Sequence, residues 1–422
     1  MYNMTVFLKI QNFFKSKDLR QLAENFFSLS ILKVVNLILP LITLPYLIKV
    51  LGFHYYGAII LALSLIAYFQ ALTDYGFNLS ATRDVARHRH SQKQLSLIYS
   101  KTIWSKIVLL SGSLIFLLLL IYFVPQFKED RIIFLLMCLM LIGNAMFPEW
   151  FFRGVEKMRY ITILDLFVKL LFTIGVFVFI HQPKDYWLYP FLFSCGYIIS
   201  AIISYFIIYK SFSIKLRIVK ISQVRSTLRK GFPLFINQFI PTLFNSTTNF
   251  MVGIFLGKSA AGLFGVLRQL IQILTVLNGV VTSIFYPYLI RNKAKFKIYS
   301  KIYLIIFTII VFIYGLSHMW LFNWVGIKGD NANEVFISLL LGALSISFYS
   351  VFATNYLIVR GYDNFVMRYT VGISLMGFLT CYPLLKNFGL VGGALNILLC
   401  QFLLGIIAVI GYVKFSKEIS NA

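Results

Sequence analysis

The chain has 422 residues, of which 59% are hydrophobic and only 13% are charged, and its mean hydropathy is +0.82. A soluble domain cannot bury that much apolar surface, so the composition excludes an ordinary globular protein and predicts a protein that crosses a membrane many times. The formal net charge of +25 would suit a nucleic-acid-binding protein. However, no basic segment is long enough to form a separate domain, so we expect no nucleic-acid partner.

Twelve apolar runs follow one another along the chain. A helix needs about 20 mostly apolar residues to cross a bilayer, and lipid does not tolerate unpaired backbone groups, which favours helices throughout. The expected fold class is an all-α integral membrane protein of about 12 transmembrane helices in two six-helix halves. The predicted helices are residues 25–48, 55–77, 102–124, 131–151, 161–181, 186–209, 231–256, 260–286, 299–319, 335–359, 366–385 and 390–413.

Lysines and arginines are concentrated in every second gap between these helices, beginning with the N-terminal segment. Short loops rich in Lys and Arg stay on the cytoplasmic side, so both termini are expected to be cytoplasmic. Residues 1–24 are predicted to form an amphipathic N-terminal segment, and 210–230 a basic linker between the halves 25–209 and 231–413. Residues 414–422 are expected to form a cytoplasmic tail.

The two halves carry a weak internal repeat. Gly52 and Gly57 recur as Gly257 and Gly262, each displaced by 205 residues, and a leucine precedes the first glycine of both pairs. With six helices per half, both halves point the same way, as in transporters whose binding site lies between parallel repeats. The first helix of each half also carries two prolines, which predict either bending elements or static kinks: Pro40, Pro45, Pro233 and Pro241.

Charged side chains inside a membrane are costly, so each one is a candidate functional residue. Three basic residues lie well inside the predicted helices: Lys33, Lys169 and Arg268. Arg268 stands beside Gln269 and cannot practically deprotonate, so it must face water, a carboxylate or an anionic substrate. Lys33 either extends to the inner surface or lines the same cavity.

Two acidic residues are candidates for coupling transport to an ion. Asp74, at the inner end of the second helix, either titrates, anchors a basic residue such as Arg83, or caps the helix at the membrane interface. Asp165 and Lys169 are four residues apart and share one helix face, so they can form an ion pair. That pair is either purely structural or opens when an anion or another ion enters.

The seventh helix is unusually polar. It contains Asn237 and Gln238, and then five consecutive polar residues, 245–249. Five such residues cannot all face lipid, so they predict a hydrated or sugar-contacting face that includes Asn245 and Asn249, or an unwound segment. Hydrogen bonds between helices are the competing interpretation.

Catalytic and metal-binding patterns are missing from the sequence. The histidines are scattered, and there is no phosphate-binding glycine loop or nucleophile motif. We therefore expect no enzymatic activity, no metal and no cofactor apart from a coupling H⁺ or Na⁺. The four cysteines lie within predicted helices without metal-ligand or redox spacing: Cys138, Cys195, Cys381 and Cys400.

Two segments at the inner side resemble a known family. Residues 72–86 (LTDYGFNLSATRDVA) and 148–162 (PEWFFRGVEKMRYIT) closely resemble segments of the Wzx-type O-antigen and polysaccharide flippases. These belong to the superfamily that also contains the multidrug and toxin extrusion (MATE) transporters and the lipid II flippases. The proline and glycine pattern of residues 39–57 is similar to the start of the same family, and the likeness in length and helix number covers the whole chain.

The resemblance implies a flippase in the bacterial plasma (inner) membrane. Its substrate would be an undecaprenyl-diphosphate-linked oligosaccharide, an O-antigen or capsule repeat unit, moved from the inner to the outer leaflet by alternating access. Other expected partners are membrane lipids and, as candidates, a polysaccharide polymerase and a chain-length regulator. A MATE-like exporter of small molecules and a membrane glycan polymerase or ligase are the alternatives.

The charged residues suggest a mechanism compatible with that function. The lipid tail need not leave the bilayer, whereas moving the diphosphate and sugars through it is prohibitively expensive. Arg268, Lys169 and Lys33 would offset that cost in a cavity between the halves. Arg83 and Arg153 would gather the diphosphate at the inner mouth, and Asp74 or Asp165 would couple the cycle to H⁺ or Na⁺.

Overall fold

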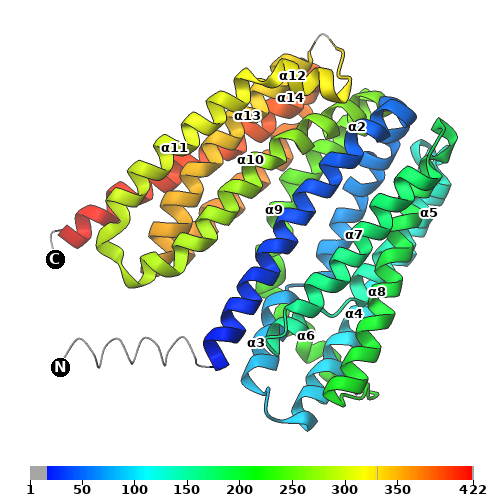
Figure 1. Cartoon of the computed structure of the whole chain (residues 1–422), viewed down its shortest axis with the longest axis vertical. Coiled ribbons are helices and arrows are strands. Elements are labelled where there is room, and N and C mark those ends of the chain that lie inside the picture. Colours follow the sequence, from blue (N-terminus) through cyan, green and yellow to red (C-terminus); the bar gives the residue numbers. More distant parts are fainter. Residues whose placement is uncertain (1–16, 330, 421–422) are drawn as a thin grey trace.

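The N-terminal half is a bundle of helices that occupies one side of the molecule (Figure 1). The computed structural model describes residues 17–329 and 331–420, so the first sixteen residues of the predicted N-terminal segment lie outside the described residues. The helices of this half are α2 (Lys17–Asp74), α3 (Phe77–Arg87), α4 (Gln92–Phe123), α5 (Arg131–Met146), α6 (Glu149–Gly154), α7 (Arg159–Phe179) and α8 (Leu188–Phe212), with the 3₁₀ turns η1 (Pro125–Phe127) and η2 (Pro183–Trp187).

The C-terminal half forms a second bundle beside the first (Figure 1). Within the described ranges both halves are helical and contain no strand, which confirms the predicted all-α class. The elements of this half are α9 (Ile221–Leu256), α10 (Lys258–Arg291), η3 (Lys293–Lys295), α11 (Phe296–Leu316), α12 (His318–Val325), α13 (Ala332–Phe348), the π-helix η4 (Tyr349–Leu357), η5 (Ile358–Arg360) and α14 (Asp363–Ser420).

Ten helical stretches among the described residues are long and apolar enough to cross a membrane. Two of them, Ile31–Arg87 and Asp363–Ser416, contain 57 and 54 residues. A straight helix of that size would be about 80 Å long, far more than the hydrocarbon core of about 30 Å. A non-helical glycine interrupts α2 at Gly52 (φ 70°, ψ 171°) and α14 at Gly389 (φ 54°, ψ −134°), and the first stretch breaks again at Gly76, between α2 and α3. Gly52 and Gly389 both fall in connections that the sequence predicts, 49–54 and 386–389.

Several predicted helix boundaries differ from the structure. The predicted helix 131–151 is divided before Pro148 into α5 and α6, because proline cannot continue the hydrogen-bond ladder. The predicted helix 335–359 changes from α13 into the π-helix η4. The predicted linker 210–230 is irregular only over 213–220, since α9 already begins at Ile221.

The outer surface is covered by large apolar side chains. Ile115, Ile163 and Phe312 are 62%, 59% and 65% exposed. In water so large an apolar surface would drive aggregation, whereas in a bilayer it contacts lipid tails. The protein is therefore a multi-pass integral membrane protein.

The internal repeat is present in the backbone. Gly257 (φ 90°, ψ 171°) has nearly the same dihedral angles as Gly52. A Cβ atom on Gly57 would lie 1.7 Å from the Lys258 carbonyl oxygen, and one on Gly262 would lie 2.1 Å from the Phe53 carbonyl oxygen. Adding 205 to Gly57 and Phe53 gives Gly262 and Lys258, so the internal repeat relates the two contacts to each other. The halves therefore cross through equivalent surfaces.

The halves approach each other at the end where this crossing lies and diverge toward the opposite end (Figure 1). The opposite end carries α3, α6 and the basic linker 213–220, and is the side predicted to be cytoplasmic. The glycines at the crossing let two backbones touch, which is how membrane helices pack most closely. The two bundles therefore meet at the crossing and lie farther apart at the end that carries the basic loops (Figure 1).

Candidate substrate-binding site

A polar hollow of about 330 Å³ lies between α9 and α10. Arg268 lies at this hollow, and its guanidinium donates hydrogen bonds to the backbone oxygen of Asn245 at 2.7 Å and to its side-chain oxygen at 3.4 Å. The structure thus brings together three of the predicted site residues, Arg268, Asn245 and Asn249. The other residues of the lining are Ser246, Gly265, Gln269 and Gln272.

The side chains of the five polar residues 245–249 point in three different directions. Asn245, Ser246 and Asn249 face the hollow. Thr247 shares a hydrogen bond with Tyr68 of the N-terminal half, and Thr248 accepts one from the buried Asn396 within its own half at 3.1 Å. α9 is helical throughout this stretch, so the alternative of an unwound segment is wrong. The helix instead joins both halves while presenting one polar face. The side chain of Asn237 lies outside the described residues.

No carboxylate neutralises Arg268 among the residues that the structure describes. The sequence gives the reason, since residues 231–329 contain no Asp or Glu. A cation at membrane depth without a fixed counter-ion is costly. The hollow is therefore suited to an anion supplied from outside the chain.

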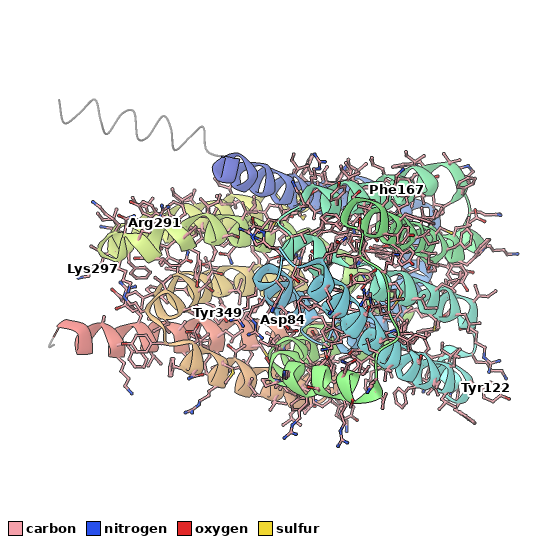
Figure 2. All side chains as sticks on the ribbon, turned by 90° about the horizontal axis from the view of Figure 1, so that it is seen from below. Asp84, Tyr122, Phe167, Arg291, Lys297 and Tyr349 are labelled. Atoms are coloured by element: carbon pink, nitrogen blue, oxygen red, sulfur yellow. The ribbon has the colours of Figure 1, made fainter. Side chains whose placement is uncertain are left out.

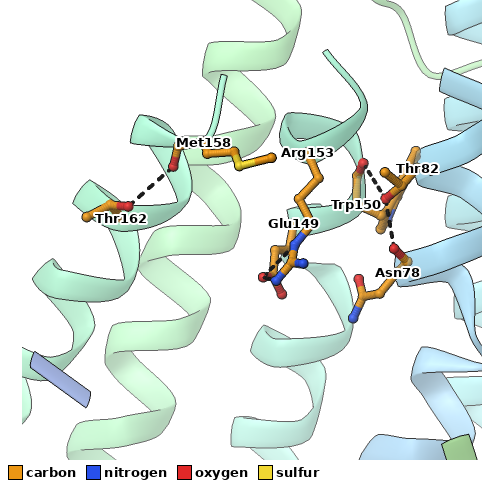
Figure 3. A network of polar contacts seen from close by, with 7 residues as sticks. All are labelled: Asn78, Thr82, Glu149, Trp150, Arg153, Met158 and Thr162. Carbon is orange, nitrogen blue, oxygen red and sulfur yellow. Dashed lines mark hydrogen bonds and ion pairs between the residues drawn. The ribbon is translucent and has the colours of Figure 1, made fainter. Parts of the chain in front are cut away.

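The two family-like segments pack against each other in the N-terminal half (Figure 3). The Thr82 hydroxyl lies 2.9 Å from the Asn78 carbonyl oxygen and 3.0 Å from that of Trp150, which ties α3 to α6. A Cβ atom on Gly154 would lie 2.5 Å from Val85, so glycine is needed for this close packing. The segments therefore form one structural unit.

A second hollow, of about 450 Å³, lies between α3, α4 and α9 at the basic end. Four basic residues line it: Arg83, Arg87, Lys101 and Lys230. Arg83 is 57% exposed and contacts only its neighbour Asp84, at 3.7 Å, among the ion pairs of the described chain. Arg153 is not part of the lining, because it is paired with Glu149 one turn earlier in α6. Arg83 is thus placed to meet an anion, whereas Arg153 already has a partner.

Asp74 is paired with a residue that the sequence analysis missed. Its partner is Lys106 of α4, at 3.1 Å, so it does anchor a basic residue, but not Arg83, which the sequence analysis gave as an example. The Lys106 side chain is only 2% exposed and that of Asp74 is 31% exposed. Lys106 is therefore a fourth basic residue at membrane depth, held by one carboxylate.

Asp165 and Lys169 do not form the predicted ion pair; both residues are described and no contact within 4 Å joins their charged groups. The Lys169 ammonium instead lies 5.4 Å from the ring centre of Phe193 on α8. One oxygen of the Asp165 carboxylate is buried without a hydrogen-bond partner. The i,i+4 spacing permits a pair, but the aromatic face competes for the ammonium.

Lys33 links the two halves. Its ammonium donates a hydrogen bond to the Ser283 hydroxyl of α10 at 3.1 Å. It therefore lies at the junction of α2 and α10, away from Arg268, and does not line the polar hollow.

Ion pairs join the halves at the end where they cross. The Lys258 ammonium lies 2.7 Å from Asp130 and 2.5 Å from Glu129, both in the connection between α4 and α5. Asp130 is buried and also accepts a hydrogen bond from Tyr186 at 3.2 Å. Hydrogen bonding and charge attraction from Lys258 lower the pKa of the exposed Glu129 carboxyl. These contacts fasten the halves beside the Gly57–Gly262 crossing.

Residues 22–293 match the family described as polysaccharide biosynthesis protein. The chain belongs to this family. Two curated proteins, each described as a "Putative O-antigen transporter", are similar over 90% of the chain. The one from Escherichia coli K12 is 26% identical, with 94% of its length covered, and the one from Shigella dysenteriae is 24% identical, with 97% covered.

Solved structures confirm the MATE-like fold. An inward-facing multidrug resistance MATE transporter matches with a TM-score of 0.62, covering 92% of this chain and 98% of that one at 13% identity. An outward-facing one matches with a TM-score of 0.58, covering 94% and 96% at 14% identity. The chain therefore has the fold of these structures, whereas such low identities say nothing of the substrate.

Proposed function

We propose that this family member is a flippase, not an enzyme, that moves a polyprenyl-diphosphate-linked oligosaccharide from the inner to the outer leaflet of a bacterial plasma membrane. The observation that carries the proposal is Arg268. It is a cation at membrane depth in a polar hollow, with no acidic residue in 231–329 to neutralise it. The named function of the curated relatives supports the same substrate class.

The chemistry of the hollow fits a diphosphate next to sugars. A guanidinium donates paired hydrogen bonds to phosphate oxygens, and the Asn and Gln amides around it can donate to and accept from sugar hydroxyls. The basic hollow at Arg83 lies at the basic end, where an anionic headgroup would arrive. The apolar surface of the helices lets the lipid tail stay in the bilayer.

Alternating access would proceed by rocking of the two halves. The described conformation would load the headgroup from the basic end, while the Lys258 contacts keep the far end shut. Opening the far end requires those ion pairs to separate. The binding energy of the headgroup, together with an ion, would supply the necessary free energy.

We assign the coupling role to Asp165 before Asp74. One Asp165 oxygen is buried without a hydrogen bond and is free to accept H⁺ or Na⁺, whereas Asp74 is already bound to Lys106. The coupling ion is a separate part of the proposal from the cargo.

A MATE-like exporter of small cationic molecules is the alternative. Such cargo needs acidic side chains in the cavity, and Arg268 would repel it. The absence of Asp and Glu from 231–329 therefore favours an anionic cargo.

The test is deletion of the gene in its native host. We expect loss of surface polysaccharide and accumulation of the lipid-linked oligosaccharide in the inner leaflet, both reversed by the wild-type gene. Unchanged surface polysaccharide in the deletion strain would refute the proposed function.

A further inference from the structure

An apolar groove of about 450 Å³ runs along the lipid-facing side of the C-terminal half, between α10 and α11. One wall is a stripe of isoleucines on α11: Ile298, Ile302, Ile306 and Ile310. Leu277 and Val281 of α10 belong to the other wall. These residues recur every three or four positions, so each wall is a single continuous helix face.

The floor of the groove is aromatic and fixed in place. Tyr299, Tyr303 and Phe307 are stacked in a row, with both neighbouring ring centres 5.7 Å apart. The hydroxyls of the two tyrosines point inward, where Asn355 donates to Tyr299 at 2.7 Å and Tyr303 donates to Asn278.

The partners of these tyrosines are themselves held in the interior. Asn355 is fully buried in the π-helix η4. Asn278 donates to Ser350 of the same π-helix at 2.9 Å. The aromatic floor therefore keeps its shape whether or not a lipid covers it.

The groove is long enough to hold part of an extended lipid chain. From Lys295 to Ile310 a helix rises about 22 Å, which is most of the roughly 30 Å hydrocarbon core. Lipid tails are as apolar as these side chains, so the groove selects by shape and contact and not by hydrophobicity alone.

One end of the groove is strongly cationic. Lys295 lines it, and Arg291, Lys293 and Lys297 are exposed beside it. Figure 2 shows Arg291 and Lys297 together at the end of the α10–α11 hairpin. Because 231–329 lacks acidic residues, this charge has no counter-ion within the hairpin. It lies on the basic side of the membrane, where the substrate would be loaded.

We propose that this groove binds the polyprenyl chain of the lipid-linked substrate, with the diphosphate at the Lys295 end; the assignment rests on the proposed function. A groove with one row of contact residues suits a lipid that has one long chain and one anionic head. A glycerophospholipid fits less well because it has two chains. A larger apolar hollow of about 820 Å³ between α13 and α14 has no charged lining residue and so offers nothing to a diphosphate.

The groove would act as the docking site that precedes translocation. With 3.6 residues per turn, Arg268 and the groove residues Leu277 and Val281 lie on roughly opposite faces of α10. A chain in the groove therefore holds its headgroup at the basic end of α10, from which the headgroup can enter between the halves. The tail stays in lipid throughout.

The chain offers a matched set of variants. Ile302 and Ile306 lie in the groove and are 53% and 52% exposed, while Ile305 and Ile309 lie outside it on the same helix and are 51% and 52% exposed. Changing each to Trp adds the same bulk to an equally lipid-exposed position. Ile302→Trp and Ile306→Trp fill the groove, and Ile305→Trp and Ile309→Trp do not.

The experiment measures binding of radiolabelled C55 polyprenyl phosphate to the purified full-length protein in lipid nanodiscs. We expect Ile302→Trp and Ile306→Trp to weaken binding at least about fivefold, since dispersion contacts along the chain are lost, and both controls to bind like wild type. Lys295→Met should weaken binding of the phosphate but leave that of the uncharged C55 polyprenol unchanged. This second variant tests the site without added bulk.

Two results would overturn the inference. One is wild-type binding by the groove variants, and the other is displacement of the probe by an equal concentration of dioleoyl phosphatidic acid, which carries an anionic head on two chains. Either result leaves the proposed function intact if deletion of the gene still abolishes surface polysaccharide. Normal polysaccharide after deletion would refute the proposed function itself.

Discussion

The two halves handle charge inside the membrane differently. In the N-terminal half, Lys106 is held by Asp74 and Arg153 by Glu149, both through ion pairs. In the C-terminal half, Arg268 has only the oxygens of Asn245 as partners. A paired charge is satisfied by the fold, whereas an unpaired one next to a hollow is available to a ligand. The difference predicts that removing the paired charge of Lys106 should damage stability, whereas removing the unpaired charge of Arg268 should damage transport.

The largest effect is expected for the buried pair. Lys106→Met leaves Asp74 without its partner, and breaking such a pair costs about 3–5 kcal/mol. We expect a much lower melting temperature and little protein in the membrane. The double variant Asp74→Asn/Lys106→Met should recover most of the loss. If the double variant transports nothing although it is stable and abundant, the pair has a role in transport that we have not assigned.

Arg268→Ala tests the other side of the comparison. Hydrogen bonds to charged groups contribute about 1.5–3 kcal/mol, which corresponds to a roughly 10- to 150-fold fall in surface polysaccharide. Melting temperature and protein amount should stay near wild type, because no fixed carboxylate is left unpaired. Ser246→Ala in the same hollow is the control and should have a smaller effect. Wild-type polysaccharide output by Arg268→Ala would remove this residue from the site.

Equivalent substitutions at the crossing between the halves should reduce stability by equal amounts. Gly57→Ala and Gly262→Ala each force a methyl group against a backbone carbonyl of the other half, and overpacking costs about 1–3 kcal/mol. Both should reduce stability by similar amounts, measured by thermal unfolding of the purified protein. Gly279→Ala on α10 is the control, since nothing lies within 4 Å of its Cβ position. Strongly unequal effects would argue against equivalent surfaces in the two halves.

The smallest effect is expected for coupling between Asp165 and Lys169. Because their charged groups form no ion pair, the effects of Asp165→Asn and Lys169→Met on polysaccharide output should add, with a coupling energy below about 0.5 kcal/mol. Asp165→Asn alone should also abolish any dependence of transport on the coupling ion. A large coupling energy would show that the two side chains pair during the transport cycle.

Much of the architecture could be predicted from the sequence because membrane helices obey simple physical rules. The apolar runs gave the order of the helices, and the two glycine pairs gave the repeat that Gly52 and Gly257 display in their dihedral angles. The polar run 245–249 and Arg268 also pointed to the hollow, since neither can face lipid.

Contacts between distant segments could not be predicted in the same way. Lys106 lies close to the basic inner loop and resembles one more topology signal, and only the packing of α4 on α2 shows its carboxylate partner. Glu129, Asp130 and Lys258 lie in short outer connections, where nothing in the sequence indicates that they meet. The i,i+4 spacing of Asp165 and Lys169 was misleading because Phe193, from another helix, competes for the ammonium.

The most direct test of the central claim uses purified protein in vesicles that contain the lipid-linked oligosaccharide. Transfer across the bilayer is measured by the fraction of oligosaccharide that an external glycosidase can cleave over time. We predict that vesicles with wild-type protein expose the oligosaccharide faster than protein-free vesicles and that Arg268→Ala vesicles do not. Equal rates in wild-type and protein-free vesicles, or an Arg268→Ala variant as fast as wild type, would contradict the account.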